Sequence, residues 1–229
     1  MADAAPEPET AEAWPITRPE FAEADALEEA DDPGGALELI TKMADLESSA
    51  EAQWRVARCY SALGDFEAKG SEEMKSKFAL GLAAAQKAVE LDTTNPYGHK
   101  WYALMLGQTS SLLGMKEKIE KSYTMKEEAT MALLQLPSDA SLQYLLGNWC
   151  IGVADLSWIE RKAASAFFAT PPESSYEEAL GYLLSAAQNR ENWIRCAKLV
   201  GDVVVRARAA RGRAAGSGAR ARGCGRARS

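Results

Sequence analysis

The residue types that carry out most enzyme chemistry are scarce in this chain. His99 is the sole histidine among 229 residues, and the four cysteines Cys59, Cys150, Cys196 and Cys224 lie far apart with no CxxC pair. A zinc site needs several such ligands close together, and a disulfide framework needs paired cysteines in an oxidising compartment. We therefore predict no metal, no cofactor and a reducing, cytoplasmic setting.

Motifs that would start an enzyme mechanism are also missing from the sequence. HExxH, GxSxG, GxGxxG and GxxxxGK[ST] do not occur. Glutamates do occur as adjacent pairs, at Glu72-Glu73, Glu127-Glu128 and Glu177-Glu178. Neighbours on a helix point about 100° apart, so these pairs indicate solvated faces and not paired acid and base groups. His99 is expected to pack or cap a helix, and we predict that the chain is not an enzyme.

The pattern of apolar residues from about 36 to 205 is helical throughout. Apolar residues recur at spacings of three and four, as in Trp54, Ala57, Tyr60 and Leu63. Strict alternation of β-branched residues is missing, and prolines such as Pro96 and Pro137 fall between the apolar segments. These features predict an all-α protein.

Small residues recur at a fixed spacing that indicates repeated helical hairpins. The segment Ala50–Phe66 is typical of the first helix of a tetratricopeptide repeat, with small Ala57, and Lys87–Pro96 is typical of the end of a second helix, with small Ala88. From the small residue of a second helix to that of the next first helix, three steps are each 15 residues: Ala88 to Ala103, Ala132 to Gly147, and Ala186 to Gly201. The predicted fold is a tetratricopeptide-like solenoid of irregular hairpins over 36–205.

Two terminal arms of opposite charge flank this predicted domain. Residues 1–35 form an acidic arm with few large apolar groups, which we predict to be disordered apart from a short helix near Phe21–Ala30. Residues 206–229 hold eight arginines and no acid, and we predict that they too are disordered. This tail is either a contact for polyanions such as RNA or an anionic membrane surface, or an altered C-terminus on a truncated domain. In the second case Val200, Val203 and Val204 lack a partner helix and the end of the domain frays.

Four strings in the chain are more specific than the repeat pattern: HKWYA (His99–Ala103), KEKIEKSYTMKEEA (Lys116–Ala129), LLGNWC (Leu145–Cys150) and FATPPESSYEEALGYL (Phe168–Leu183). They resemble the regulator of microtubule dynamics family, and the similarity covers roughly residues 36–201. The resemblance implies a non-catalytic helical protein whose partners are microtubules or tubulin, including those of the spindle. It therefore implies a cytoplasmic location on the cytoskeleton. Some family members carry an N-terminal membrane anchor, and we expect no transmembrane segment here.

The first helices of stacked hairpins line a concave surface that commonly binds partners. Placing the small residues in register puts one set of side chains on that surface: Trp54, Arg58, Lys100, Tyr144, Asn148, Arg195 and Lys198. The cations form a basic strip in an acidic domain, and the aromatics are of the kind that dominates interfaces. We predict that this groove binds other proteins through an extended acidic peptide, with nucleic acid an unlikely partner. The alternatives are that these residues are ordinary solvated faces, or that the chain binds polyanions through its arginine tail.

Overall fold

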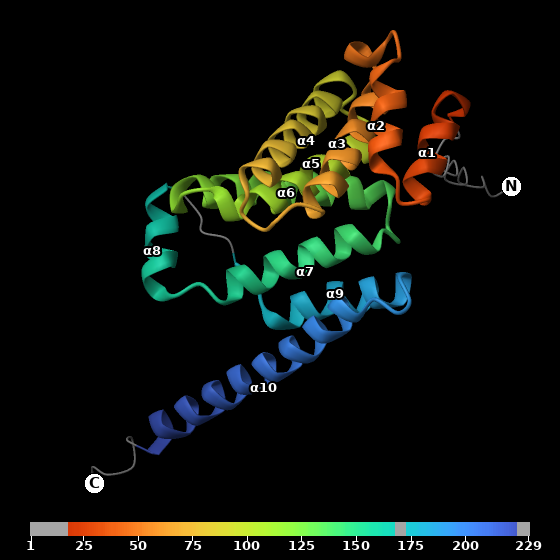
Figure 1. The fold of residues 1–229 in the computed structure, drawn as a ribbon. Coiled ribbons are helices and arrows are strands. Elements are labelled where there is room, and N and C mark those ends of the chain that lie inside the picture. Colours follow the sequence, from red (N-terminus) through yellow and green to blue (C-terminus); the bar gives the residue numbers. More distant parts are fainter. Residues whose placement is uncertain (1–17, 168–172, 224–229) are drawn as a thin grey trace, which may run out of the picture. The chain divides into compact units, whose positions relative to one another are not determined.

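The computed structural model describes residues 18–167 and 173–223, and within these ranges the only regular elements are helices. The predicted all-α class is therefore confirmed. Part of the FATPP string, residues 168–172, and the ends of both predicted arms lie outside the described residues. Figure 1 shows the α-helices, which are α1 (Ala22–Glu29), α2 (Pro33–Thr41), α3 (Ala50–Asp65), α4 (Glu72–Leu91), α5 (Pro96–Thr109), α6 (Met115–Gln135), α7 (Ala140–Ala154), α8 (Trp158–Phe167), α9 (Tyr176–Asn189) and α10 (Ile194–Gly223). Short 3₁₀ turns occupy Pro19–Phe21, Leu46–Ser48 and Ser110–Leu112.

Side-chain caps explain where several helices begin. The side chains of Ser49, Ser71 and Ser175 accept hydrogen bonds from the backbone N–H groups three residues on. Asp32 and Asp139 do the same at the starts of α2 and α7. Each cap satisfies a backbone donor that the first turn leaves without a partner, a contribution of about 1 kcal/mol.

The helices form two compact units. The first unit comprises the described residues of 1–105 together with Leu134–Pro137, and the second comprises Leu106–Leu133 and the described residues from Ser138 onward. Helices α5 and α6 contribute residues to both units.

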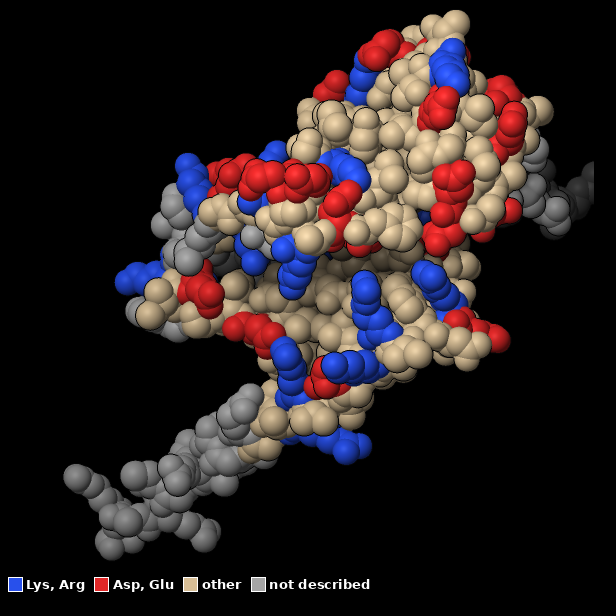
Figure 2. Space-filling model, viewed as in Figure 1, with Lys and Arg blue, Asp and Glu red and all other residues tan. Residues whose placement is uncertain are grey.

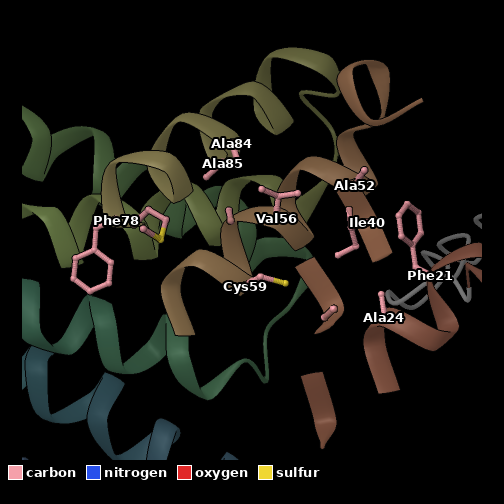
Figure 3. Close-up of a cluster of buried hydrophobic side chains, with 12 residues drawn as sticks. Phe21, Ala24, Ile40, Ala52, Val56, Cys59, Phe78, Ala84 and Ala85 are labelled. Atoms are coloured by element: carbon pink, nitrogen blue, oxygen red, sulfur yellow. The ribbon is translucent and has the colours of Figure 1, made fainter. Parts of the chain in front are cut away.

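The core of the first unit runs from α1 and α2 through α3 to α4. Phe21, Ala24, Ile40, Val56 and Phe78 are all buried in it. Phe21 belongs to the 3₁₀ turn before α1, and Figure 3 shows the other four side chains on α1, α2, α3 and α4. Burying a side chain the size of Phe or Ile stabilises the fold by about 1.5–3 kcal/mol. This cluster therefore fixes α1 as part of the folded unit.

In the second unit, α7 and α9 pack side by side, and α10 packs against α9 (Figure 1). The close approach of α7 and α9 depends on Gly147, because a Cβ at this position would lie 2.7 Å from Cγ of Leu183. The second unit is thus built from neighbouring helices of a hairpin stack, joined through small residues.

The predicted register of small residues agrees with the observed burial. Six of the seven positions are buried: Ala57, Ala88, Ala103, Ala132, Gly147 and Ala186. Gly201 is exposed, and a Cβ built there meets nothing within 4 Å. The spacing therefore identified buried positions at six of the seven places, and the prediction is wrong for Gly201.

The structure differs from the predicted arm at residues 18–35, which are helical and packed. Phe21 is 2% exposed and Ala24 is 4% exposed, so both belong to the core of the first unit. Asp25, one of the acidic residues that suggested disorder, pairs with Arg55 and Arg58 of α3, which offsets the cost of placing its charge against the protein. The prediction of disorder rested on composition, which treats such charges as unfavourable for folding and carries no information about their partners.

The structure also differs from the predicted tail, because α10 continues as a helix to Gly223. Val203 is fully buried and Ala207 is 4% exposed, so the prediction that Val203 lacks a partner is wrong. Arg206 pairs with Asp155, and Arg211 pairs with Glu177 at 2.9 Å. The first arginines of the predicted tail are therefore bound to the second unit.

Candidate functional site

Trp54 is the first of the predicted contact residues, and α3 places it inside the first unit. Its side chain is 5% exposed, and its ring stacks on that of Tyr97 from α5 at 4.9 Å between centroids. Its Nε1 donates a hydrogen bond to Oε2 of Glu51 at 3.2 Å. Trp54 is therefore a packing residue of the first unit, and little of its side chain is exposed to a partner.

Arg58 lies on the same helix and binds α1. Its Nη2 donates to Oδ1 of Asp25 at 2.7 Å, and its Nε lies 3.6 Å from Oε2 of Glu28. The neighbouring Arg55, which the sequence analysis did not single out, holds Asp25 in a two-point contact at 2.9 and 2.8 Å. The Arg55 guanidinium also lies 4.2 Å from the centroid of the Phe21 ring.

These contacts form a charge network that fastens α1 to α3. Burial by itself would raise the pKa of Asp25, but the hydrogen bonds and positive charges of Arg55 and Arg58 outweigh it and lower the pKa below its usual value of 3.8. Arg55 is held from its other side by Glu51 at 2.7 Å. Arg58 is therefore engaged within the protein, and reversing its charge would test stability before it tested binding.

Lys100 is the third predicted residue of the first unit and is half-buried on α5. Its Nζ lies 5.6 Å from the ring centroid of Tyr97 and 5.7 Å from that of Trp101. Since Tyr97 stacks on Trp54 and Arg58 lies 5.4 Å from the Trp54 ring, the structure brings the three predicted residues of this unit together. On the visible face, Asp and Glu side chains gather over α1 to α3 (Figure 2).

Tyr144 and Asn148 lie one turn apart on α7 in the second unit. The Tyr144 ring packs against Trp193 at 4.6 Å between centroids, and the Arg190 guanidinium lies 4.9 Å from the Trp193 ring. Asn148 donates from Nδ2 to the carbonyl oxygen of Tyr144 at 3.0 Å. Both predicted residues are half-buried, so each keeps part of its side chain accessible.

Arg195 and Lys198 complete the predicted set on the first turns of α10. Both are exposed, and three residues of spacing place them on one face of the helix. Among the described residues, neither forms a salt bridge, in contrast to Arg206 and Arg211 further along α10. Figure 2 shows Lys and Arg side chains spread over the visible face of the part formed by α7, α9 and α10. These two cations are available to a partner.

The second unit also contains a pocket that the sequence analysis missed. Its volume is about 610 Å³, and its walls come from the end of α5, from α6, from α7 and from the segment that follows α7. Asn148 is the one predicted residue that lines it. A sequence signal existed in Gly152, a glycine within a helix on the pocket side, but a helical glycine alone does not indicate a cavity.

The groups with catalytic potential are engaged in packing. His99 is 4% exposed, and its Nε2 lies 2.9 Å from the carbonyl oxygen of Thr93. Burial raises the pKa of Cys59 far above its ordinary value, with the nearby Glu28 adding to the effect, and burial also raises the pKa of Cys150. These thiols therefore stay protonated at neutral pH. Among residues 18–167 and 173–223, no group of three or more potential ligands is placed to hold a metal ion.

The described helices include none with the length and apolar character needed to span a bilayer. What the structure offers is helical hairpins with a basic helix face and an apolar pocket. That combination defines the class as an all-α protein built of packed helical hairpins.

Comparison with known proteins places this helical-repeat protein in a family. The sequence model of the family described as Regulator of microtubule dynamics protein 1-3 matches residues 21–205. The chain belongs to this family.

Three relatives show the extent of the similarity. Regulator of microtubule dynamics protein 1 of Bos taurus is 36% identical over 171 residues, which are 75% of this chain and 54% of that protein. Regulator of microtubule dynamics protein 3 of Xenopus laevis is 36% identical over 150 residues, which are 66% of this chain and 32% of that protein. Regulator of microtubule dynamics protein 2 of Bos taurus is 34% identical over 155 residues, covering 66% of this chain and 38% of that protein. The chain thus spans about half, or less, of the length of these relatives.

Proposed function

We propose that this chain is a non-catalytic protein-binding scaffold that associates with microtubules in the cytoplasm, including the spindle, and regulates their dynamics. Membership of a family named for microtubule dynamics supports this role. The buried positions of His99, Cys59 and Cys150 support a role in binding over a role in catalysis. The proposed ligand is an extended acidic peptide on the microtubule surface.

The observation that carries the proposal is the exposed pair of cations on α10. Arg195 and Lys198 follow Trp193 in the chain, and Trp193 packs on Tyr144 of α7. A carboxylate-rich peptide would gain attraction from both cations and contact area from the aromatic pair.

Co-sedimentation with microtubules tests this proposal. The double variant R195E/K198E should pellet with microtubules about tenfold less tightly than the unmodified chain, because an attraction becomes a repulsion. Both residues are exposed, so circular dichroism and thermal unfolding should be unchanged.

The matched control is K42E/K69E, which changes the net charge by the same amount on exposed positions of the first unit. It should pellet like the unmodified chain. Equal losses in both double variants would show that only the total charge matters, and unchanged pelleting of R195E/K198E would remove the proposed surface.

A further inference from the structure

We propose that the pocket of the second unit receives a bulky apolar side chain, aromatic or large aliphatic, from the same acidic peptide. This inference rests on the proposed function and adds the chemistry that selects the peptide. On this inference the protein recognises an apolar side chain flanked by carboxylates, and the negative charge of the peptide is not sufficient by itself.

The walls of the pocket are suited to an apolar anchor. Leu106, Ile119, Met125, Leu145 and Trp149 all line it, and most of its surface is apolar. Trp149 is fixed in place because its Nε1 donates to the carbonyl oxygen of Ser122 at 3.1 Å. Nζ of Lys126 also lies over this ring, 4.2 Å from its centroid. A pocket of about 610 Å³ lies within the range of ligand sites and exceeds the volume of one aromatic side chain.

Glycine keeps the pocket open. A Cβ at Gly152 would meet no atom within 4 Å, although the residue lies in helix α7 and lines the pocket. A larger residue there would fold without a clash and would project into the free space. The pocket can therefore be filled by mutation without disturbing the core.

Charged residues at the rim of the pocket determine which ligands it favours. Lys118 and Lys121 line the pocket from α6, and within the described part of the chain no carboxylate forms an ion pair with either. Hydrogen bonds with Ser157 lower the pKa of Glu160, and the nearby charge of Lys118 adds to this lowering. The two rim carboxylates are engaged by this chain: Glu160 accepts from the backbone N–H of Ser157 at 2.8 Å, and Asp155 accepts from the hydroxyl of Tyr176 at 2.6 Å and pairs with Arg206. The unsatisfied charge at the rim is positive, which fits a ligand with carboxylates beside its apolar group.

Fluorescence anisotropy with two synthetic peptides tests the inference on the full chain. Both peptides consist of glutamate and glycine with a fluorescent label, and they differ at one central position, phenylalanine in one and alanine in the other. The phenylalanine peptide should bind about tenfold or more tightly, because its ring is removed from water in the pocket.

Two variants assign that preference to the pocket. G152L should reduce the ratio of the two affinities to near one, whereas the matched variant G181L should keep it. Gly181 is likewise an exposed helical glycine in the second unit with nothing within 4 Å of its Cβ, and it does not line the pocket. K118E/K121E should weaken both peptides about tenfold and preserve the ratio, with K42E/K69E as the charge-matched control.

The outcomes separate this inference from the proposed function. If the chain pellets with microtubules but binds both peptides equally, the pocket has no part in recognition and only this inference fails. If it neither pellets nor binds either peptide, the proposed function fails with it. If G152L abolishes binding of a fluorescent fatty-acid analogue and leaves the peptide ratio intact, the pocket belongs to a small amphiphile and the inference is overturned.

Discussion

Asp25 binds two arginines of the first unit, Arg55 and Arg58, and so holds both side chains within the protein. Its carboxylate holds Arg55 through two hydrogen bonds and Arg58 through one, while the guanidinium of Arg55 covers the ring of Phe21. Arg55 is only 6% exposed, so it depends on carboxylates to compensate for the loss of water. At this position the charges contribute to the fold of the first unit.

Replacing Asp25 with asparagine should destabilise the protein by about 1–3 kcal/mol at pH 7, since a buried arginine loses its charged partner. The pKa of Asp25 is lowered in the folded state, so its stabilising contribution is complete above the usual value of 3.8 and is lost as the pH falls through the lower folded-state value. The gap between the original protein and D25N should therefore shrink at about pH 3. Urea unfolding followed by tryptophan fluorescence at both pH values measures it.

The control for this substitution is E29Q, which removes an exposed carboxylate from the same helix. It should change the free energy of unfolding by less than about 0.5 kcal/mol at either pH. A gap for D25N that stays constant from pH 7 to pH 3 would show that the charge of Asp25 is not what stabilises α1.

Gly147 is a second residue whose identity the packing requires. A methyl group there would lie 2.7 and 2.8 Å from Cγ and Cδ2 of Leu183, so G147A should cost about 1–3 kcal/mol through overpacking, less a few tenths regained from better helix propensity. G181A meets no atom within 4 Å and should instead stabilise by about 0.5–1 kcal/mol. Differential scanning calorimetry should show the two melting temperatures moving in opposite directions, and a shared direction would contradict the α7–α9 contact.

Among the elements, α10 is the helix whose packing can be tested most directly. Val203 is fully buried on it, while Val205, two residues on, is 67% exposed. V203D should destabilise the second unit by more than about 3 kcal/mol, because it buries a charge without a partner, and V205D should have almost no effect. Limited trypsin digestion at Arg206 and Arg208 should be fast in V203D and slow in V205D. Equal, rapid cleavage of both would mean that α10 does not pack on α9.

The same helices show how far the sequence predicts this fold. Spacing placed six of the seven small residues correctly, because close helix contacts constrain residue size at fixed intervals and Ala57, Ala132 and Ala186 satisfy that rule locally. A short helix near Phe21–Ala30 was predicted, but the packing of α1 and the order at the start of the predicted tail were not, because both depend on partners distant in sequence. Asp25 meets Arg55 across 30 residues, and Arg206 meets Asp155 across 51. Neither pairing leaves a periodic signal.

The candidate site was predictable to the same degree. Register identified Tyr144 and Asn148 on α7 and the exposed pair on α10, since a face of a helix follows from its period. It could not distinguish an arginine with no ion pair among the described residues, such as Arg195, from one that binds another helix, such as Arg58. The pocket could not be predicted from the sequence either, because a cavity is the space that the helices around it leave unfilled.

At the scale of the whole molecule, net charge opposes the proposed interaction. The chain carries a formal charge of −7 and would be repelled by an acidic surface as a whole. Attraction must therefore come from local cations that act within roughly 10 Å at 0.1 M salt. Arg195 and Lys198 meet this requirement because they are exposed and have no ion-pair partners among the described residues.

The dependence of binding on salt concentration distinguishes attraction to Arg195 and Lys198 from repulsion by the net negative charge. Raising NaCl from about 50 to about 200 mM should weaken microtubule pelleting of the original chain severalfold, because short-range attraction to the cation pair is screened. In R195E/K198E the attraction is gone and only repulsion remains to be screened, so its weak pelleting should stay level or improve over the same range. A parallel decline in both proteins would place the salt-sensitive contact elsewhere on the chain, and a level response in the original chain would mean that charge does not drive the association.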